Sequence, residues 1–194
     1  MRSGGLYMAD DPELSAARAR ARALTRRFNA CDDPDQARAI LRDLLGGMGA
    51  RLHIEPPFRC DYGQNITFGE DCYVNYDCII LDVCPVTIGD RVLIAPRAGL
   101  YAAGHPVDAA VRATGLENGG PITIEDDVWL GGNVTVNPGV TIGAGSVIGS
   151  GSVVTHDIPP GVVAAGNPCR VIRPIGEEDR RTWEAQREAY LRDQ

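Results

Sequence analysis

The sequence lacks a long apolar run. No uninterrupted hydrophobic stretch approaches the roughly 18 to 20 residues that a membrane-spanning helix needs. Its first residues, MRSGGLYMADD, also lack the basic region and apolar core of a secretory signal. These absences predict no membrane association, and we expect the chain to work in the cytoplasm. Its 194 residues and 44% hydrophobic content are typical of one ordinary folded domain with a small appendage.

Positive charge is also scarce. The chain has 19 Lys and Arg residues against 26 Asp and Glu residues, which gives a formal net charge of -7. Sequence-independent binding to nucleic acid needs a basic surface that displaces counterions. The charge balance therefore argues against a nucleic-acid partner, although single basic residues could still bind a phosphate.

Closely paired cysteines of the kind that hold zinc are missing. Structural zinc sites usually show C-x₂₋₄-C pairs, whereas Cys72, Cys78 and Cys84 recur every six residues. This regular spacing indicates that the cysteines follow the fold, and a free cysteine packs as a compact hydrophobic residue. We expect these three side chains to be buried fillers, and we predict no metal site.

What the sequence does have is a six-residue repeat. From Ile124 it reads IEDDVW, LGGNVT, VNPGVT, IGAGSV, IGSGSV and VTHDIP, and every block opens with an aliphatic residue. The same frame runs upstream from Tyr62 through ILDVCP and resumes at Ile88 after a short slip. A period of six suits neither an α-helix nor a simple meander. It suits a chain that turns a corner after each short strand, so that three strands close one triangular coil and the opening aliphatic residues stack inside it, each contributing roughly 1.5 to 3 kcal/mol.

Both ends of the chain differ from this repeat. Asp11-Pro12 and Asp33-Pro34 each place a capping carboxylate before a proline suited to the first helical position. Helices are therefore expected over residues 12–28 and 34–46, and another within EEDRRTWEAQREAYL that packs through Trp183 and Tyr190. We divide the chain into an N-terminal helical region (1–53), a β-helix (54–174) and a C-terminal helix (175–194). A run of basic residues on the first helix is expected to form a solvated surface: Arg18, Arg20, Arg22, Arg26 and Arg27.

One histidine lies where the repeat breaks off. After LYAAGH the chain leaves the rhythm in a loop excursion over residues 105–121, and it returns at PITIED. Long excursions from a regular scaffold are usually functional. Pro106 restricts His105 to extended backbone angles, and histidine is the side chain best suited to take a proton near neutral pH. His105 is therefore a candidate catalytic base, with a purely structural histidine as the alternative.

The motifs around this histidine resemble those of the maltose and galactoside O-acetyltransferases, a family of hexapeptide-repeat acyltransferases. The resemblance is carried by CYVNYDCIILDVCPVTIGDRVLIAP and GHPV, by IEPPFRCDYG at 54–63, by VWLGGNVTVNPGVTIG at 128–143 and by VVAAGNPCRVI at 162–172. The N-terminal GGLYMADDPEL is similar to the family's small helical domain. The resemblance covers almost the whole chain. It implies an all-β core folded as a left-handed parallel β-helix, with a small N-terminal helical region and a C-terminal helix.

The resemblance also implies a reaction, the direct transfer of an acetyl group from acetyl-CoA to a hydroxyl of a sugar or glycoside. His105 would act as the general base, and Asn75 and the backbone amide of Gly132 would stabilise the oxyanion. Glu117 would orient His105. Asn75 also suits a simpler role, because an asparagine at a corner of the coil stabilises a turn.

Further positions match the family's binding sites. On the acceptor side they are Asp11, Asp61, Tyr73 and Asp82, and on the donor side Gly132, Ser150, Thr155, His156, Arg170 and Arg173. The two arginines could bind the phosphates of coenzyme A bidentately. His156 stands where the family often has lysine, which would weaken phosphate attraction at neutral pH. Asp11 alternatively serves only as a helix cap.

Asn75 and His105 lie in different blocks of the repeat, on different faces and different coils. They would meet more easily across a subunit boundary, and this agrees with the homotrimers of the family, so we expect a homotrimer. Two other readings stay open: an acetyltransferase with an antibiotic or serine as acceptor, and a non-catalytic β-helix scaffold in which neither residue has a role. A metal hydratase would need three histidine ligands, and His53, His105 and His156 stand in unrelated contexts.

Overall fold

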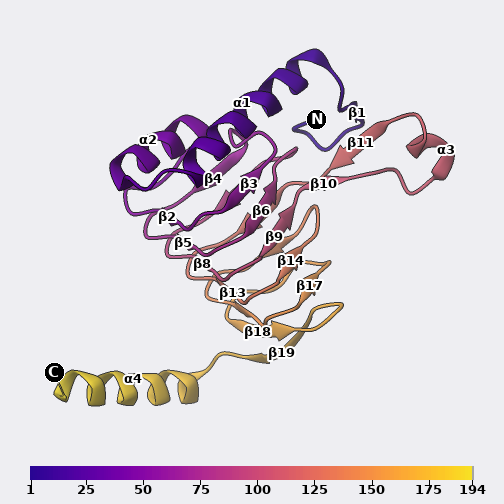
Figure 1. Cartoon of the computed structure of the whole chain (residues 1–194). Coiled ribbons are helices and arrows are strands. Elements are labelled where there is room, and N and C mark those ends of the chain that lie inside the picture. The colour runs from indigo at the N-terminus through magenta and orange to yellow at the C-terminus, as the bar shows by residue number, and fades with distance from the viewer. Residues whose placement is uncertain (194) are drawn as a thin grey trace.

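The structure is a computed structural model that describes residues 1–193. Its centre is a triangular coil of short parallel strands, and the strands of successive coils stack into three faces (Figure 1). The predicted fold class, a parallel β-helix of hexapeptide repeats with helices at both ends, is confirmed. Gln194, the last residue of the predicted C-terminal part, lies outside the described residues.

Each face is one sheet whose strands come from successive coils. Face 1 contains β2 (His53–Ile54), β5 (Tyr73–Val74), β8 (Leu93–Ile94), β13 (Trp129–Leu130), β16 (Val147–Ile148) and β18 (Val162–Ala165). Face 2 contains β3 (Phe58–Cys60), β6 (Cys78–Leu81), β9 (Gly99–Tyr101), β14 (Thr135–Val136) and β17 (Val153–Val154). Face 3 contains β4 (Ile66–Phe68), β7 (Val86–Ile88), β12 (Ile122–Ile124) and β15 (Thr141–Ile142).

The core lies inside the coil, and it is built from the opening residue of each repeat. Six of these side chains have no exposed surface: Ile124, Leu130, Val136, Ile142, Ile148 and Val154. The register of the sheets explains this stacking, because Ile124 pairs with Ile88 below it and with Ile142 above it. Cys72, Cys78 and Cys84 are buried and free, so the prediction that they fill space is confirmed.

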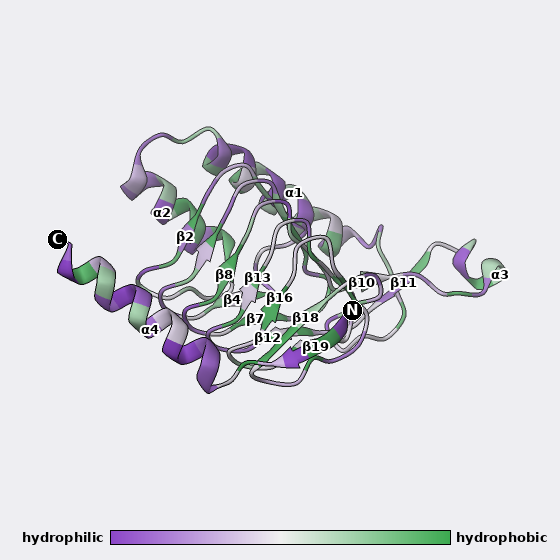
Figure 2. Cartoon of the chain, turned by 90° about the horizontal axis from the view of Figure 1, so that it is seen from below, coloured by the Kyte–Doolittle hydropathy of each residue, from purple (hydrophilic) through white to green (hydrophobic). Residues whose placement is uncertain are grey.

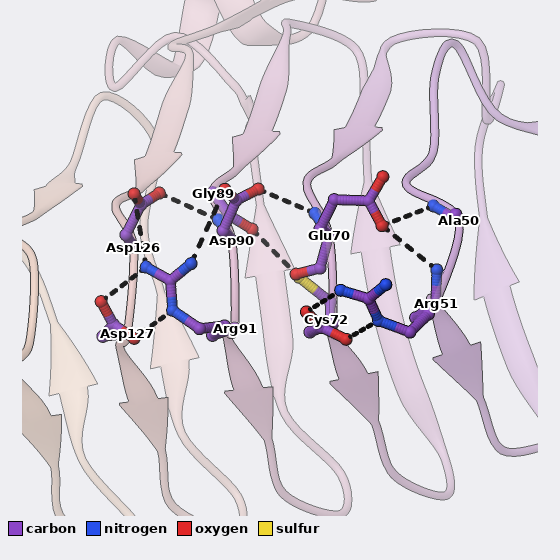
Figure 3. Close-up of polar contacts among 10 residues, drawn as sticks. Ala50, Arg51, Glu70, Cys72, Gly89, Asp90, Arg91, Asp126 and Asp127 are labelled. Atoms are coloured by element: carbon purple, nitrogen blue, oxygen red, sulfur yellow. Dashed lines mark hydrogen bonds and ion pairs between the residues drawn. The ribbon is translucent and has the colours of Figure 1, made fainter.

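The corners between faces 3 and 1 carry a ladder of charged residues. The Asp90 Oδ1 atom accepts a hydrogen bond from the Glu70 amide at 2.8 Å, and the Asp126 Oδ1 atom accepts one from the Asp90 amide at 2.9 Å (Figure 3). Arg91 donates to both oxygens of Asp127, at 2.6 and 2.8 Å. Each exposed ion pair contributes little, typically about 0.2 to 1 kcal/mol. The carboxylates nevertheless satisfy backbone amides that face solvent at the turns, and they tie neighbouring coils together.

Two helices cover the first coil. They are α1 (Pro12–Asn29) and α2 (Pro34–Leu44), and each begins at a proline after an aspartate whose carboxylate accepts two backbone amides. Helix α1 buries Ala21, Leu24 and Phe28 against the coil. In Figure 1 it runs across the top of the stack, close to β3.

The excursion forms a hairpin that leaves the third coil between faces 2 and 3. It contains β10 (Ala103–Gly104), the short helix α3 (Ala109–Arg112) and β11 (Leu116–Gly119). Strand β11 pairs antiparallel with both β10 and β1 (Tyr7–Met8). The hairpin is therefore joined to the N-terminal segment, which lies next to its base in Figure 1.

The C-terminal helix departs from expectation. Strand β19 (Arg170–Pro174) pairs antiparallel with β18, and α4 (Glu177–Arg192) then extends away from the coil in both views (Figures 1 and 2). Trp183 is 67% exposed and Tyr190 is 63% exposed. The prediction that the helix packs through these two rings is wrong for the single chain, because within residues 1–193 α4 follows the closing strand β19 and none of its residues is buried.

None of the helices formed by residues 1–193 has the length and apolar character needed to cross a bilayer.

Candidate active site

A cavity of about 370 Å³ lies where the excursion meets the N-terminal segment and helix α1. Its polar lining comes from four separate parts of the chain: Tyr7, Arg18, Arg22, Asp61, Tyr62, His105 and Glu117. Three of the residues predicted from the sequence, His105, Glu117 and Asp61, therefore share one cavity.

His105 directly follows β10, and Glu117 lies on β11, the strand that pairs with it. The His105 side chain is exposed, whereas Glu117 is half-buried. The Tyr7 hydroxyl donates a hydrogen bond of 2.7 Å to the Glu117 carboxylate, and the same two residues face each other in the β1–β11 pairing. Burial, followed by this hydrogen bond and the nearby carboxylate charge, raises the pKa of Tyr7. The tyrosine is therefore a neutral donor that holds Glu117 at the cavity wall.

Arg18 was expected on a solvated surface, but the structure places it half-buried in this cavity. Its guanidinium donates to the Tyr62 hydroxyl at 2.8 Å and to the backbone carbonyl of Ala9. Asp61 lies beside it, and burial raises the pKa of this carboxyl while Arg18 and Arg22 oppose that rise. A carboxylate, a guanidinium and two phenols that line one cavity can together donate to and accept from the hydroxyls of a polyol.

Asp82 does not line the cavity. Its side chain is fully buried, and the carboxylate accepts backbone amides from Asp61 at 3.0 Å, Tyr62 at 2.9 Å and Asn65 at 3.3 Å. Burial raises its pKa to about 6, against the opposing effect of these hydrogen bonds. The prediction that Asp82 contacts an acceptor is wrong in this structure, because no part of the side chain reaches solvent. Asp82 instead shapes the turn that presents Asp61 and Tyr62.

Tyr73 and Asn75 lie elsewhere in the chain. Tyr73 is on face 1, where its ring stacks on His53 with 5.4 Å between centroids. Asn75 follows β5 at the corner between faces 1 and 2, and its Oδ1 atom accepts the Tyr76 amide at 2.8 Å. His105 lies at the other edge of face 2, between faces 2 and 3, where the excursion begins. A single chain therefore does not bring Asn75 and His105 into one cavity.

The residues predicted for the donor fall into three places. Gly132 and Ser150 lie at the same corner as Asn75, in later coils, and a Cβ atom on Gly132 would lie 3.9 Å from the Ser150 Oγ atom. Thr155 and His156 follow β17 at the corner between faces 2 and 3, with 2.9 Å between the Thr155 Oγ1 and His156 Nδ1 atoms. Two of the six predicted donor residues, Gly132 and Ser150, therefore lie at the same corner as Asn75.

Arg170 and Arg173 are both exposed on β19. Arg173 donates to both carboxylate oxygens of Asp179 at 2.7 Å, an ion pair that anchors the first turn of α4. Arg170 donates to the backbone carbonyl of Cys169 at 2.8 Å. Arg173 would have to exchange its carboxylate partner before it could bind a phosphate.

Asp11 is the N-cap of α1, where its Oδ1 atom accepts the amides of Glu13 at 2.9 Å and Leu14 at 3.3 Å. It does not line the cavity, whereas Ala9 does. The structure therefore shows Asp11 in its alternative role as a helix cap, and Asp33 caps α2 as predicted. In the part of the chain that the structure describes, no group of three or more His, Cys, Asp and Glu side chains is arranged to hold a metal ion.

Sequence reasoning missed Tyr7, Arg18 and Tyr62 at this cavity. Tyr7 and Glu117 are 110 residues apart, and Arg18 and Tyr62 are 44 residues apart. No local pattern marks such pairs. One sequence feature could have indicated Tyr7: the short stretch GGLYM precedes a capped helix and lies outside the repeat, so it needs a partner elsewhere in the fold.

Comparisons with known proteins agree with this architecture. Residues 1–49 match the maltose acetyltransferase hexapeptide capping motif, and residues 121–156 match the bacterial transferase hexapeptide (six repeats). The galactoside O-acetyltransferase of Escherichia coli strain K12 is 43% identical over 182 residues, covering 93% of this chain and 90% of that protein.

Two solved structures extend the similarity to the fold. A maltose O-acetyltransferase from Clostridium difficile 630 has a TM-score of 0.89 and 50% identity, covering 91% of this chain and 95% of its own. A galactoside acetyltransferase in complex with coenzyme A has a TM-score of 0.90 and 44% identity, covering 92% and 90%. A capped hexapeptide coil with a hairpin excursion, together with these near full-length matches, shows that the chain belongs to the maltose and galactoside O-acetyltransferase family of hexapeptide-repeat acyltransferases.

Proposed function

We propose that this chain transfers an acetyl group from acetyl-CoA to a hydroxyl group of a sugar or glycoside. The observation that carries the proposal is the cavity at the excursion, which is lined by His105, Glu117 and Asp61 together. Its lining offers several hydrogen-bonding groups that converge from separate elements, as a hydroxyl-rich acceptor requires. Membership of the family supports acetyl-CoA as the donor.

In the proposed reaction, His105 removes the proton from the acceptor hydroxyl as its oxygen attacks the thioester carbonyl carbon. A carbon–oxygen bond forms and the carbon–sulfur bond breaks. The proton then passes from His105 to the departing thiolate, so that free coenzyme A and an acetyl ester are the products. Glu117, held by Tyr7, is the residue we propose to orient the imidazole.

The oxyanion of the tetrahedral intermediate needs donors that are in place before it forms. We propose the Asn75 side chain and the Gly132 backbone amide for this role, supplied by a second copy of the chain. The two lie at one corner, away from His105 of the same chain. Ser150, Thr155, His156, Arg170 and Arg173 remain our candidates for binding coenzyme A.

We propose a homotrimer in which each active site is shared between two neighbouring chains, and mixing inactive variants tests this sharing. Co-expressed chains carrying Asn75→Ala and His105→Ala should regain activity, because about a quarter of the sites would combine two intact partners under random assortment. Each variant expressed alone should be inactive or nearly so. Thiol release from the purified mixture gives the measurement, and a mixture no more active than its components would contradict a site shared between chains.

Thiol release from acetyl-CoA across a panel of acceptors tests the function itself. We expect turnover above the hydrolysis background with glucose, maltose or a galactoside, and none with serine or chloramphenicol, which represent the two alternative acceptor classes. If turnover occurred only with serine or only with the antibiotic, that compound class and not a sugar would be assigned as the acceptor. A chain inactive on every acceptor would favour the non-catalytic scaffold.

We also propose the cytoplasm as the place where the protein acts.

A further inference from the structure

A second cavity adjoins the proposed acceptor site. It has a volume of about 350 Å³ and lies between α1 and the outer surface of face 2. The two cavities share Arg22, Asp61 and Leu81 in their linings. A ligand whose reacting hydroxyl lies at His105 can therefore extend past these shared residues into the second cavity.

Three arginines line this second cavity. Arg22 and Arg26 come from α1, one helical turn apart, and Arg59 comes from β3. None of their guanidinium groups forms an ion pair or a side-chain hydrogen bond within residues 1–193, whereas Arg51, Arg91 and Arg173 are all paired with carboxylates. The chain carries a net charge of -7, so a concave place lined by three cations without carboxylate partners contrasts with its overall charge.

The only carboxylate in the lining is Asp61, which is half-buried at the boundary with the first cavity. Ile79 and Leu81 of β6 add an apolar surface to the same lining. Such an apolar surface suits the ring or hydrocarbon part of a ligand, while unpaired guanidinium groups suit planar, bidentate recognition of a carboxylate, sulfate or phosphate.

We propose that this arginine cavity, formed by Arg22, Arg26 and Arg59, binds an anionic substituent carried by the acceptor beyond its reacting hydroxyl. The inference rests on the proposed function, because it takes the neighbouring cavity as the place where the hydroxyl reacts. It narrows the acceptor class from glycosides in general to glycosides with an acidic group on the aglycone or on a following unit.

A matched set of acceptors tests the proposal. Phenyl β-glucoside is compared with its 4-carboxyphenyl and 4-sulfophenyl counterparts, which place a negative charge one ring away from the sugar. For the parent, KM should be about tenfold lower for the charged glucosides, the gain expected of one charge-assisted hydrogen-bonded contact. In the double variant Arg26→Gln, Arg59→Gln this preference should disappear, with kcat and KM for the neutral glucoside unchanged. Arg22 is left intact because it also lines the first cavity.

Arg27→Gln is the matched control, since Arg27 is exposed on the same helix and lines neither cavity. It should keep the full preference. Equal KM values for charged and neutral glucosides in the parent would overturn the proposal. So would a preference that survives in the double variant, or one that is lost equally in the Arg27 control.

Equilibrium titration of the same three glucosides without acetyl-CoA separates this inference from the proposed function. Tighter binding of the charged glucosides to the parent, lost in the double variant, would support the anion site. Binding that is tight and charge-dependent without any thiol release would count against acetyl transfer and leave the anion site standing. Equal affinity for all three glucosides would overturn the anion site whatever the transfer assay shows.

Discussion

Replacing His105 with alanine is expected to lower kcat by about 10²- to 10⁴-fold, the usual contribution of a positioned general base. KM for acetyl-CoA should change little, because a base acts on the proton in transit and not on the bound donor. The side chain is exposed at the base of the excursion, so its loss should leave the free energy of unfolding nearly unchanged. Initial rates of thiol release at saturating acceptor provide the measurement.

His53→Ala is the matched control for this variant. His53 is also exposed, and it stacks on Tyr73 and contacts Glu55 on face 1, away from the cavity. Its replacement should leave kcat unaltered. Parent-like turnover in the His105 variant would remove the base assignment, and an equal loss in both variants would point to an effect on assembly.

Replacing Asp82 with alanine is expected to lower the free energy of unfolding by roughly 2 to 4 kcal/mol, because buried amides lose their acceptor. The amides of Asp61, Tyr62 and Asn65 would all be left unsatisfied inside the coil. The turn that presents Asp61 to the cavity would loosen at the same time, so acceptor KM should rise. Urea unfolding at pH 7 gives the stability, and an unchanged midpoint would contradict the structural role.

Asp82→Asn serves as the control and adds a test of pH dependence. Its carbonyl oxygen can still accept the amides of Asp61 and Tyr62, so it should be milder than alanine. Burial raises the pKa of Asp82 to about 6 from an ordinary 3.8, so between these values the folded chain keeps a proton that the unfolded chain has lost. The stability of the parent relative to Asp82→Asn should therefore fall as the pH rises from about 4 to 6 and then stay constant. A difference that grows with pH would show that the carboxylate is the favoured form.

The coil could be predicted from the sequence because each six-residue block is stabilised in the same way, by burial of its first side chain. Each block places one aliphatic residue, such as Ile124 or Leu130, at the same place on a stacked strand, so the period alone identifies the residues that point inward. The helix starts were equally local, since Asp11 and Asp33 cap the helices that directly follow them. The three-part division of the chain stays a prediction.

Part of the site could be predicted from the sequence. The break in the period indicates His105 and Glu117, which belong to the excursion, and the motif at 54–63 indicates Asp61. Tyr7 and Arg18 could not be predicted, because they reach the cavity by contacts across the fold. Asp82 was expected to bind a hydroxyl of the acceptor, as carboxylates often do, but it is buried and accepts backbone amides. The alternation in β6 held the better signal, since Cys78 and Ile80 point inward and Asp82 continues their side of the strand.

The C-terminal helix was misjudged for another reason. Trp183 and Tyr190 are large apolar rings, and in a single chain such rings normally find a surface to cover. Within residues 1–193, however, α4 begins after β19 has paired with β18, and it buries none of its residues.

The closing strand β19 also affects whether another chain can add strands to the end of the coil. A stack of parallel strands would otherwise end in a row of free backbone groups, an edge on which another chain could continue the ladder and grow a fibre. Here β19 pairs antiparallel with β18, with a register shift between Val163 and Ala164, and it carries Arg170 and Arg173. At the opposite end, α1 and α2 lie over the first coil. On face 1 the repeat thus ends in an antiparallel strand, which offers no parallel edge on which another copy could continue the same ladder.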